Sequence, residues 1–289
     1  MFCNLKICFP ESIIEAVNIK NESLGLGKYL AGGTDILVEQ NDPTKEKRLI
    51  CLDKIKELDG ISFLNDSLYI GSLVCISQLE KKLYESKDYT FSALMDGISQ
   101  IGSTQIRNVA TIGGNICSSL PSADSIGPLM VLDSKLVLTD GYNERVVRIG
   151  DFCTGVGKNI LANGEILKAI IIPFNRDVSS AYIKHGRRNA MEIALVGASC
   201  ALISDPCSGV CNSIKVTITT AGVKHINAVD VEEKLLNNRI TDDNISIASK
   251  LVLNSVSPRD SFRCSAAYRK EVLPELVKRA IKLALIRRR

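Results

Sequence analysis

Two pairs of consecutive glycines are the residues of this sequence best suited to binding a ligand. Gly32 and Gly33 stand in the stretch YLAGGTDI, and Gly113 and Gly114 stand in TIGGN. A backbone without Cβ atoms can turn with positive φ and lie close to a bound molecule. Where a helix follows, its free N–H groups and positive end favour an anionic oxygen, most commonly that of a phosphate. Two such loops suit a ligand with a pyrophosphate, such as a dinucleotide.

Neither glycine pair matches an established phosphate-binding motif. The patterns G-x-x-x-x-G-K-[ST] and G-x-G-x-x-G are absent from both stretches. The segment GVGKNI at 155–160 begins the second pattern, but it lacks the third glycine and is expected between strands instead of between a strand and a helix. Because a lone Gly-Gly pair is usually a simple turn, a phosphate site and a plain turn both stay open at this level.

Other catalytic signatures are weak. His185 and His225 are the two histidines, and neither has metal-ligand partners at helical spacing. The sequence holds no nucleophile elbow to support a Ser-His-Asp arrangement. The cationic cluster KHGRRN at 184–189 is typical of a solvated edge, although it could also neutralise an anionic ligand. The residues alone therefore indicate no catalytic acid or base and no metal site.

The ten cysteines indicate reduced thiols. No C-x-x-C pair occurs, whereas zinc and iron–sulfur sites use tighter and repeated spacings. Most of the cysteines have apolar neighbours, which is typical of buried thiols in a cytoplasmic protein. The loop CSGVC at 207–211 could bind a ligand, but we expect none there.

Composition excludes several classes of function. The 289 residues carry a net charge of +4, no tryptophan and only 5% aromatic residues, so we expect no nucleic-acid partner. No apolar run approaches the roughly 20 residues that a bilayer requires, and the N-terminal stretch lacks a signal-peptide pattern. We therefore expect a cytoplasmic globular protein without a membrane span, with its core spread over two or three domains or one large one.

Apolar periodicity predicts two regions before residue 175. The first, 1–55, has a helix at 11–20, a short strand before its glycine pair and the first turns of a helix at 35–40. The second, 56–175, has an amphipathic helix at 91–106 before its glycine pair. A hairpin with an Asp-Gly turn and a further strand follow that pair.

The pattern changes near residue 175. The segments that follow read as strands with little helix between them. After these strands, the spacing predicts helices at 230–237, at 241–255 and from 269 onward. The change of pattern indicates a domain boundary, although no linker composition marks it.

Taken together, these stretches resemble the FAD-binding subunits of the molybdenum hydroxylases, the xanthine dehydrogenase and carbon monoxide dehydrogenase family. The resemblance runs nearly end to end. FCTGVGK, RNAMEIA and NICSSLPSADS are most similar to the bacterial xanthine dehydrogenase form. In chain order, the matching stretches are YLAGGTDIL, LYIGSLVCISQL, QIRNVATIGGNICSSLPSADSIGPLMVLDSKLVL, FCTGVGK, GEILKAIIIP, YIKHGRRNAMEIALVG and SPRDSFRCSAAYRKEVL.

The resemblance implies an α+β fold with two domains. Residues 1–175 would form a two-lobed FAD-binding domain of the PCMH type, similar to that of vanillyl-alcohol oxidase, with lobes at about 1–55 and 56–175. Residues 176–289 would form a smaller α+β domain, similar to the C-terminal domain of the carbon monoxide dehydrogenase flavoprotein.

The resemblance also implies the residues of an FAD site. The two glycine loops would hold the pyrophosphate, and Asp124 would bind the ribityl or ribose side. Ile101 and Leu167 would lie near the adenine half, and Lys184 and Ile193 near the flavin ring. Glu192 stands where many relatives carry Asp. The implied cofactor-binding residues are Tyr29, Leu30, Ala31, Gly32, Gly33, Thr34, Asp35, Ile36, Ile101, Thr111, Ile112, Gly113, Gly114, Asn115, Asp124, Leu167, Lys184 and Ile193.

By the same resemblance, no side chain would be catalytic, because flavin N5 does the chemistry. FAD would receive single electrons from [2Fe-2S] clusters on a small partner subunit and pass them to NAD as hydride. A large partner subunit would bind molybdopterin, and the complex would be a dimer of heterotrimers.

The resemblance favours xanthine dehydrogenase, an enzyme of purine catabolism. Nicotinate, carbon monoxide and aldehyde dehydrogenase complexes stay open, because substrate would bind on another chain. A non-catalytic flavin-binding assembly module and a colourless nucleotide-phosphate-binding enzyme, such as a transferase, are further alternatives.

Overall fold

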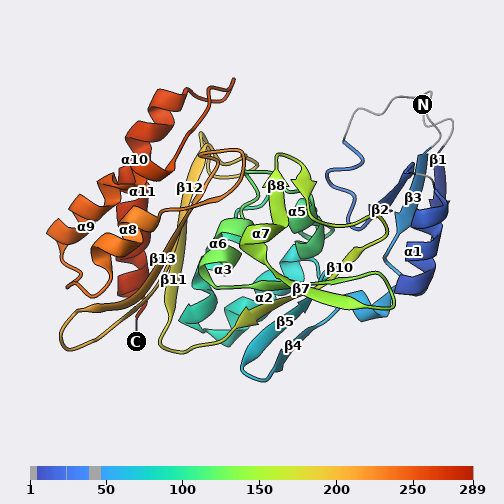
Figure 1. Ribbon diagram of the computed structural model, residues 1–289, viewed down its shortest axis with the longest axis horizontal. Coiled ribbons are helices and arrows are strands. Elements are labelled where there is room, and N and C mark those ends of the chain that lie inside the picture. Colours follow the sequence, from blue (N-terminus) through green and yellow to red (C-terminus); the bar gives the residue numbers. More distant parts are fainter. Residues whose placement is uncertain (1–4, 24, 39–46, 289) are drawn as a thin grey trace.

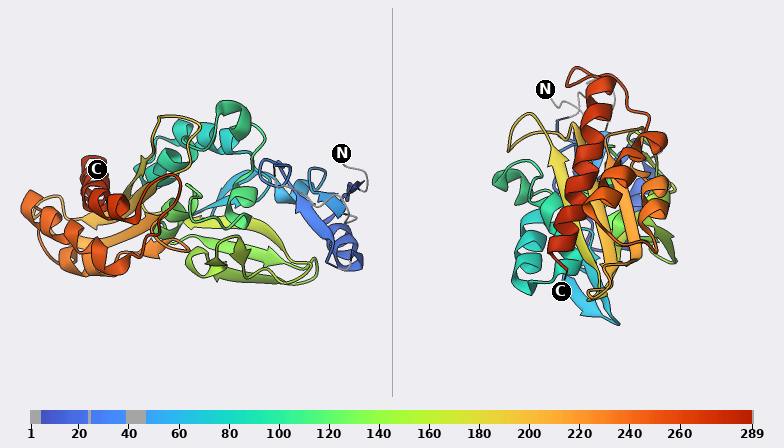
Figure 2. Two further views of the ribbon diagram at one scale, coloured as in Figure 1. Left: turned by 90° about the horizontal axis from the view of Figure 1, so that it is seen from above. Right: turned by 90° about the vertical axis from the view of Figure 1, so that its left-hand side faces the viewer.

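The computed structural model describes residues 5–23, 25–38 and 47–288. Within these ranges, three larger β-sheets and their helices follow one another along an elongated molecule (Figures 1 and 2). The N-terminal sheet lies at one end, the helices of the C-terminal part lie at the other, and the central sheet lies between them. The helix-and-strand content is that of the predicted α+β class.

The N-terminal sheet is parallel and is covered by one helix. Helix α1 (Ile13–Glu22) begins where the Ser12 hydroxyl accepts a hydrogen bond from the Glu15 amide at 3.2 Å, as a helix N-cap does. Its apolar stripe, with Ala16 completely buried, packs against the sheet. In order across the sheet, the strands are β1 (Leu5–Cys8), β3 (Lys47–Cys51) and β2 (Gly27–Leu30).

The helix expected at 35–40 is not formed in its described part. Residues 34–38 form turns, in which the Leu37 amide donates to the Gly33 carbonyl at 3.1 Å. Gly33 directly precedes these turns and has a φ of 73°, a left-handed conformation that cannot be part of a right-handed helix. Residues 39 and 40 lie outside the described residues.

The central sheet is antiparallel throughout, and its long strand β10 lies in the middle. Ile170 and Ile172 on this strand are fully buried in the main core. The strands in order are β4 (Ile61–Leu64), β5 (Ser67–Gly71), β10 (Ile166–Pro173), β6 (Lys135–Thr139) and β7 (Glu144–Arg148).

The helices of this middle part are short, and the helix predicted at 91–106 is divided. Its two pieces are separated at Gly102, which has a φ of 52°, and Ser103 caps the second piece. The elements are η1 (Lys56–Leu58), α2 (Ile76–Ser86), η2 (Tyr89–Phe91), α3 (Ser92–Ile98), α4 (Thr104–Arg107), α5 (Ile112–Cys117), α6 (Ile126–Val131), α7 (Ile149–Phe152) and the hairpin of β8 (Cys153–Gly155) and β9 (Lys158–Asn159).

The C-terminal sheet is antiparallel and packs on a long helix. Helix α11 (Ala266–Ile286) lies along the sheet (Figure 2) and buries an apolar face that includes Leu273 and Ile281. The region predicted as one helix at 241–255 is two helices. The remaining elements are β11 (Ser179–His185), β12 (Val196–Ser204), β13 (Cys211–Thr219), β14 (Ile226–Asn227), α8 (Val229–Leu235), α9 (Asp242–Lys250) and α10 (Val252–Ser255).

Strand β11 joins the C-terminal part to the central part. Successive side chains of a strand point to opposite faces, so its two faces can serve two cores. Ala181 and Ile183 pack in the C-terminal core. Ser180, Tyr182 and Lys184 alternate with them and contact the helical layer of the central part. The alternation of side chains along this strand therefore holds the two parts together.

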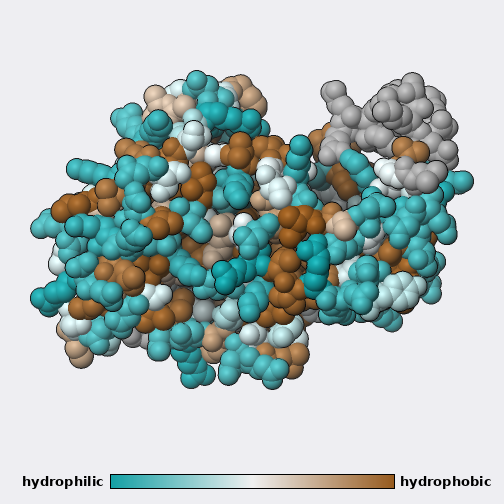
Figure 3. All heavy atoms as spheres, viewed as in Figure 1, coloured by the Kyte–Doolittle hydropathy of each residue, from teal (hydrophilic) through white to brown (hydrophobic). Residues whose placement is uncertain are grey.

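The surface shown in Figure 3 mixes apolar and hydrophilic side chains. Among the helices that the structure describes, none is long and apolar enough to cross a bilayer.

His225 of the C-terminal part contacts the central part, and its titration makes the stability of the fold depend on pH. Its Nε2 lies 3.1 Å from the Ala123 carbonyl oxygen, and burial lowers the pKa of His225 to about 4. Below an ordinary histidine pKa of about 6.5, the unfolded chain binds a proton that the folded chain excludes. We therefore expect His225 to lower the free energy of unfolding by about 2 kcal/mol between about pH 7 and about pH 5.

Urea denaturation of the wild type and of His225→Gln at both pH values measures this contribution. The Gln amide can donate to the same carbonyl but does not titrate in this range. The pH-dependent loss should therefore be smaller in the variant. Equal losses in the two proteins would show that His225 is not the group responsible.

Candidate functional site

The two glycine loops touch one another although they belong to different parts of the fold. A Cβ atom on Gly32 would lie 1.9 Å from the Val109 carbonyl oxygen and 3.0 Å from the Ala110 Cα. Only glycine permits this approach, because any side chain would overlap the facing backbone. The contact brings segments 29–36 and 108–115 together.

The first loop offers backbone donors. In the described part of the chain, the structure gives no hydrogen-bond acceptor to the amides of Gly32, Gly33 and Thr34. These residues are partly exposed. Successive backbone amides in a tight turn can form an anion-binding concavity. The loop can therefore bind the oxygen atoms of an anionic ligand.

The second loop uses its donors internally, which differs from the expectation that both loops offer free amides. Helix α5 already begins at Ile112, and the Thr111 hydroxyl accepts from the Gly114 amide at 3.0 Å. The Gly113 amide donates to the Ser72 carbonyl at 2.9 Å, and the Asn115 amide donates to the Thr111 carbonyl at 3.0 Å. The helix start and the contact with Ser72, which directly follows strand β5, therefore satisfy the amides that sequence reasoning assigned to a ligand.

The adjacent glycines of the second loop have different environments. A Cβ atom on Gly113 would lie 2.5 Å from the Ser72 Cβ atom, so this glycine permits close packing within the protein. Gly114 is exposed, and a Cβ atom there would have only the Thr111 hydroxyl within 4 Å, at 3.0 Å. Gly114 therefore presents exposed backbone four residues after Ala110, which Gly32 contacts.

Asp124 and Lys184 form a buried ion pair beyond the second loop. The Lys184 Nζ atom lies 2.7 Å from Asp124 Oδ2, and the Tyr182 hydroxyl donates to Asp124 Oδ1 at 2.7 Å. The side chains of the pair are only 7% and 6% exposed. The pKa of the Asp124 carboxyl lies above its ordinary value, because burial raises it more than Lys184 and Tyr182 lower it. Burial also raises the pKa of Tyr182 well above its ordinary value. Tyr182 is therefore a stable hydrogen-bond donor.

A hydrogen bond connects this pair to the second loop. The Ser125 hydroxyl donates to the Asn115 side-chain oxygen at 2.6 Å, and Ser125 directly follows Asp124. Lys184 also donates to the Gln100 carbonyl at 3.0 Å. Asn115 of the second loop is thus hydrogen-bonded to the residue that follows Asp124.

The other predicted residues occupy different environments. Ile101 is partly buried and follows Gln100, and Ile193 is exposed in a segment whose Met191 amide reaches the Gly102 carbonyl at 3.4 Å. Leu167 is 3% exposed within β10, so its side chain lies in the core.

The remaining residues of the first loop differ in exposure. Tyr29, Leu30, Ala31 and Ile36 are partly buried, and Asp35 is exposed.

The cationic cluster at 184–189 is largely paired. Arg187 and Arg188 each lie 3.3 Å from a carboxylate oxygen of Glu192, whose side chain is 5% exposed. His185 contacts the Tyr268 hydroxyl at 2.8 Å. The Arg187 and Arg188 side chains therefore remain on the surface with a counter-ion beside them.

Sequence reasoning missed Tyr182, Gln100 and Ser125. Tyr182 could have been found from the alternation of Ser180, Tyr182 and Lys184, which puts the three side chains on one strand face. Gln100 acts through its backbone carbonyl, and Ser125 acts through a hydroxyl in a buried turn. Neither residue carried a signal in the sequence.

The cysteine loop at 207–211 lies within the described residues. There, no three His, Cys, Asp or Glu side chains are grouped so as to hold a metal ion. Cys207 is exposed and Cys211 is fully buried, and burial raises the pKa of the Cys211 thiol to about 11.

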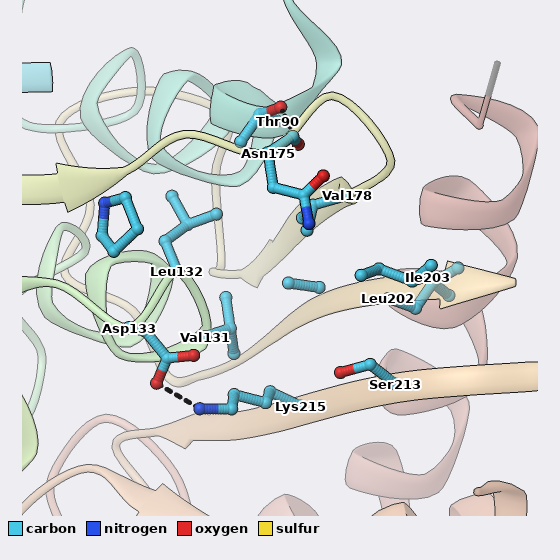
Figure 4. A pocket seen from close by; sticks show the side chains of 12 residues that line it. Thr90, Val131, Leu132, Asp133, Asn175, Val178, Leu202, Ile203, Ser213 and Lys215 are labelled. Carbon is cyan, nitrogen blue, oxygen red and sulfur yellow. Dashed lines mark hydrogen bonds and ion pairs between the residues drawn. The ribbon is translucent and has the colours of Figure 1, made fainter. Parts of the chain in front are cut away.

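A separate pocket of about 220 Å³ lies between the turn after α6 and strands β12 and β13 (Figure 4). Leu132 and Leu202 supply apolar lining, and Asp133 and Lys215 form an ion pair beside it. Ligand pockets commonly span about 300–1,000 Å³. This pocket contains none of the predicted residues and is too small for a dinucleotide.

Comparison with protein families gives two matches that together span most of the chain. Residues 3–175 match the FAD binding domain in molybdopterin dehydrogenase, and residues 181–284 match the CO dehydrogenase flavoprotein C-terminal domain. The open backbone donors of the first loop and the exposed Gly114 fit the phosphate groups of such a cofactor.

Individual relatives agree with these matches. The xanthine dehydrogenase FAD-binding subunit of Escherichia coli O157:H7 is 32% identical over 280 residues, which is 95% of this chain and 94% of that protein. The nicotinate dehydrogenase FAD-subunit of Eubacterium barkeri is 29% identical over 255 residues, covering 86% and 85%.

A solved structure shows the same fold over the whole chain. It is a chain of carbon monoxide dehydrogenase from Hydrogenophaga pseudoflava, with a TM-score of 0.92, 24% identity and complete coverage of both chains. With two domain matches in sequence order and a relative above 30% identity over nearly the full length, the chain belongs to the family of FAD-binding subunits of the molybdenum hydroxylases.

Proposed function

We propose that this chain binds FAD where its two glycine loops meet and that it transfers electrons within a xanthine dehydrogenase complex. The observation that carries the proposal is the contact of Gly32 with Val109, which brings the open amides of the first loop beside the second loop. When bound, FAD supplies the ability to accept electrons one at a time and to release them as a hydride. NAD is the proposed acceptor.

The chain's own part in this function is to bind and orient the cofactor. The amides of Gly32, Gly33 and Thr34 would donate to pyrophosphate oxygens. Gly114 would leave room for the same group, because no side chain projects from its position. The second loop would thus shape the site, while the first supplies most of its hydrogen bonds. The rest of Tyr29–Ile36 and Thr111–Asn115 would complete the two walls.

Asp124 and Lys184 would form a further wall of the site. A carboxylate has about four lone-pair positions, and Tyr182 and Lys184 occupy two of those of Asp124. The remaining positions could accept a ribityl or ribose hydroxyl. Because the charges of the pair compensate each other, the pair adds little net charge to the flavin environment. Ile101 and Ile193 would supply apolar contacts, and Leu167 would support the site from within β10.

The proposed complex has a molybdopterin-binding large subunit and a [2Fe-2S] small subunit, in a cytoplasmic dimer of heterotrimers. The 32% identity to a xanthine dehydrogenase subunit supports the choice of xanthine as substrate. The 29% identity to a nicotinate dehydrogenase subunit favours a nicotinate-oxidising complex as the second candidate. Anaerobic addition of xanthine or of nicotinate to the purified complex separates the two, because only the true substrate should bleach the flavin.

The adjacent glycines of the second loop allow binding to be separated from folding. Gly114→Val should abolish FAD retention, because the new side chain projects from exposed backbone where the cofactor would lie. It should lower the melting temperature of the flavin-free chain less than Gly113→Ala does, because only the Thr111 hydroxyl, 3.0 Å from the new Cβ atom, has to move. Gly113→Ala should instead lower the free energy of unfolding by about 1–3 kcal/mol, because its Cβ atom overlaps Ser72. Bound flavin per chain and thermal melting are measured for both variants. Stoichiometric flavin in Gly114→Val would remove Gly114 from the site.

The acceptor is tested by stopped-flow absorbance with NADH. If NAD is the acceptor, the reverse reaction should bleach the flavin of the FAD-loaded chain rapidly under anaerobic conditions. Dithionite serves as a control for full reduction. Flavin that dithionite bleaches but NADH does not would contradict NAD as the acceptor while leaving FAD binding intact.

A further inference from the structure

Strand β11 is hydrogen-bonded to helix α3 and to the turn before it at successive residues. The Ala93 amide donates to the Ser180 hydroxyl at 2.9 Å, and that hydroxyl donates to the Thr90 carbonyl at 2.7 Å. Two residues further, the Tyr182 amide donates to Asp96 Oδ2 at 3.0 Å. These bonds fix how the C-terminal sheet sits against the central part.

Asp96 is the centre of this junction because a third element also binds it. Arg287, which follows α11, donates from Nη1 to Asp96 Oδ2 at 2.6 Å and from Nη2 to Asp96 Oδ1 at 2.9 Å. Arg287 Nη1 also lies 3.1 Å from the Ser180 carbonyl oxygen. One arginine therefore joins the end of α11 to both α3 and β11.

This ion pair differs from the surface pairs of the same helix. The Arg287 and Asp96 side chains are 23% and 19% exposed, whereas those of the Arg279–Glu275 pair on α11 are 63% and 51% exposed. Planar two-point binding of a carboxylate by arginine is stronger and more directional than a single contact. Exposed pairs such as Arg279–Glu275 typically contribute little. Arg287 is therefore suited to hold a fixed geometry.

The junction is linked to the proposed FAD site through Tyr182 and Lys184. The Tyr182 amide binds Asp96, while its hydroxyl binds Asp124. Lys184 binds Asp124 and the Gln100 carbonyl, and the Gln100 side chain donates to the Asp96 carbonyl at 2.7 Å. A shift of β11 relative to α3 would therefore pull Tyr182 and Lys184 away from Asp124.

We propose that Asp96 and Arg287 are positioning residues for the FAD site, a role that rests on the proposed function. They would act without touching the cofactor. They fix the position of β11 against α3, and thereby the position of Lys184 and Tyr182 beside Asp124. The match to the C-terminal family ends at residue 284, so Arg287 lies outside the matched segment.

The test uses the full chain, stripped of flavin and titrated with FAD. Arg287→Gln should raise the FAD dissociation constant about tenfold and change the visible circular dichroism of the bound flavin. Arg287→Lys keeps the charge but loses the planar fork, so its dissociation constant should fall between those of the wild type and Arg287→Gln. Arg279→Gln is the matched control on the same helix and should stay within about twofold of the wild type.

A double-mutant cycle tests whether Asp96 and Arg287 affect FAD binding as a pair. If the two residues act as a pair, Asp96→Asn combined with Arg287→Gln should weaken FAD binding by less than the product of the single effects. If Arg287→Gln does not fold, the dissociation constant and circular dichroism of Arg287→Lys decide. Wild-type values in the folded Arg287 variants would overturn the inference alone. A wild-type chain that binds no FAD would overturn the proposed function and the inference together.

Discussion

The backbone of Gly32 lies directly against the carbonyl of Val109, and the arrangement of the candidate site depends on this contact. It joins a loop of the parallel N-terminal sheet to a loop that precedes helix α5 of the central part. The missing side chain lets the two backbones meet, and the structure gives no acceptor within the described residues to the amides of Gly32, Gly33 and Thr34. In the proposed site, the first loop would supply donors to the ligand, whereas the second loop satisfies its own donors and presents exposed backbone at Gly114.

A buried ion pair forms the other side of the proposed site. Burying Asp124 and Lys184 costs desolvation energy, which close geometry and additional hydrogen bonds must offset. Here Tyr182, Gln100 and the pair itself supply those bonds. Removing one partner would leave a buried, uncompensated charge, so the pair constrains β11 as well as the cofactor wall. The contact of β11 with the central part and the proposed cofactor site therefore have Tyr182 and Lys184 in common.

Much of this organisation could be predicted from the sequence. Strand alternation and helix periodicity gave the main elements, and the motif order indicated the family and its FAD-binding role. Local conformation was harder to predict: the helix predicted at 91–106 is interrupted at Gly102, and residues 34–38 form turns where the start of a helix was expected. The hydrogen-bond acceptors of the Gly113 and Gly114 amides could not be predicted, because they depend on the tertiary contact with Ser72 and on the Thr111 cap. The Arg287–Asp96 pair joins residues far apart in sequence, which periodicity cannot detect.

The most direct test of the account is the flavin content of the purified chain. The chain is heat-denatured, and the released chromophore is identified by chromatography and quantified against protein. The account predicts FAD near one per chain, or recovery of that stoichiometry when FAD is added to colourless protein. A chain that carries no flavin and takes up none would contradict the central claim that the two glycine loops form one FAD site.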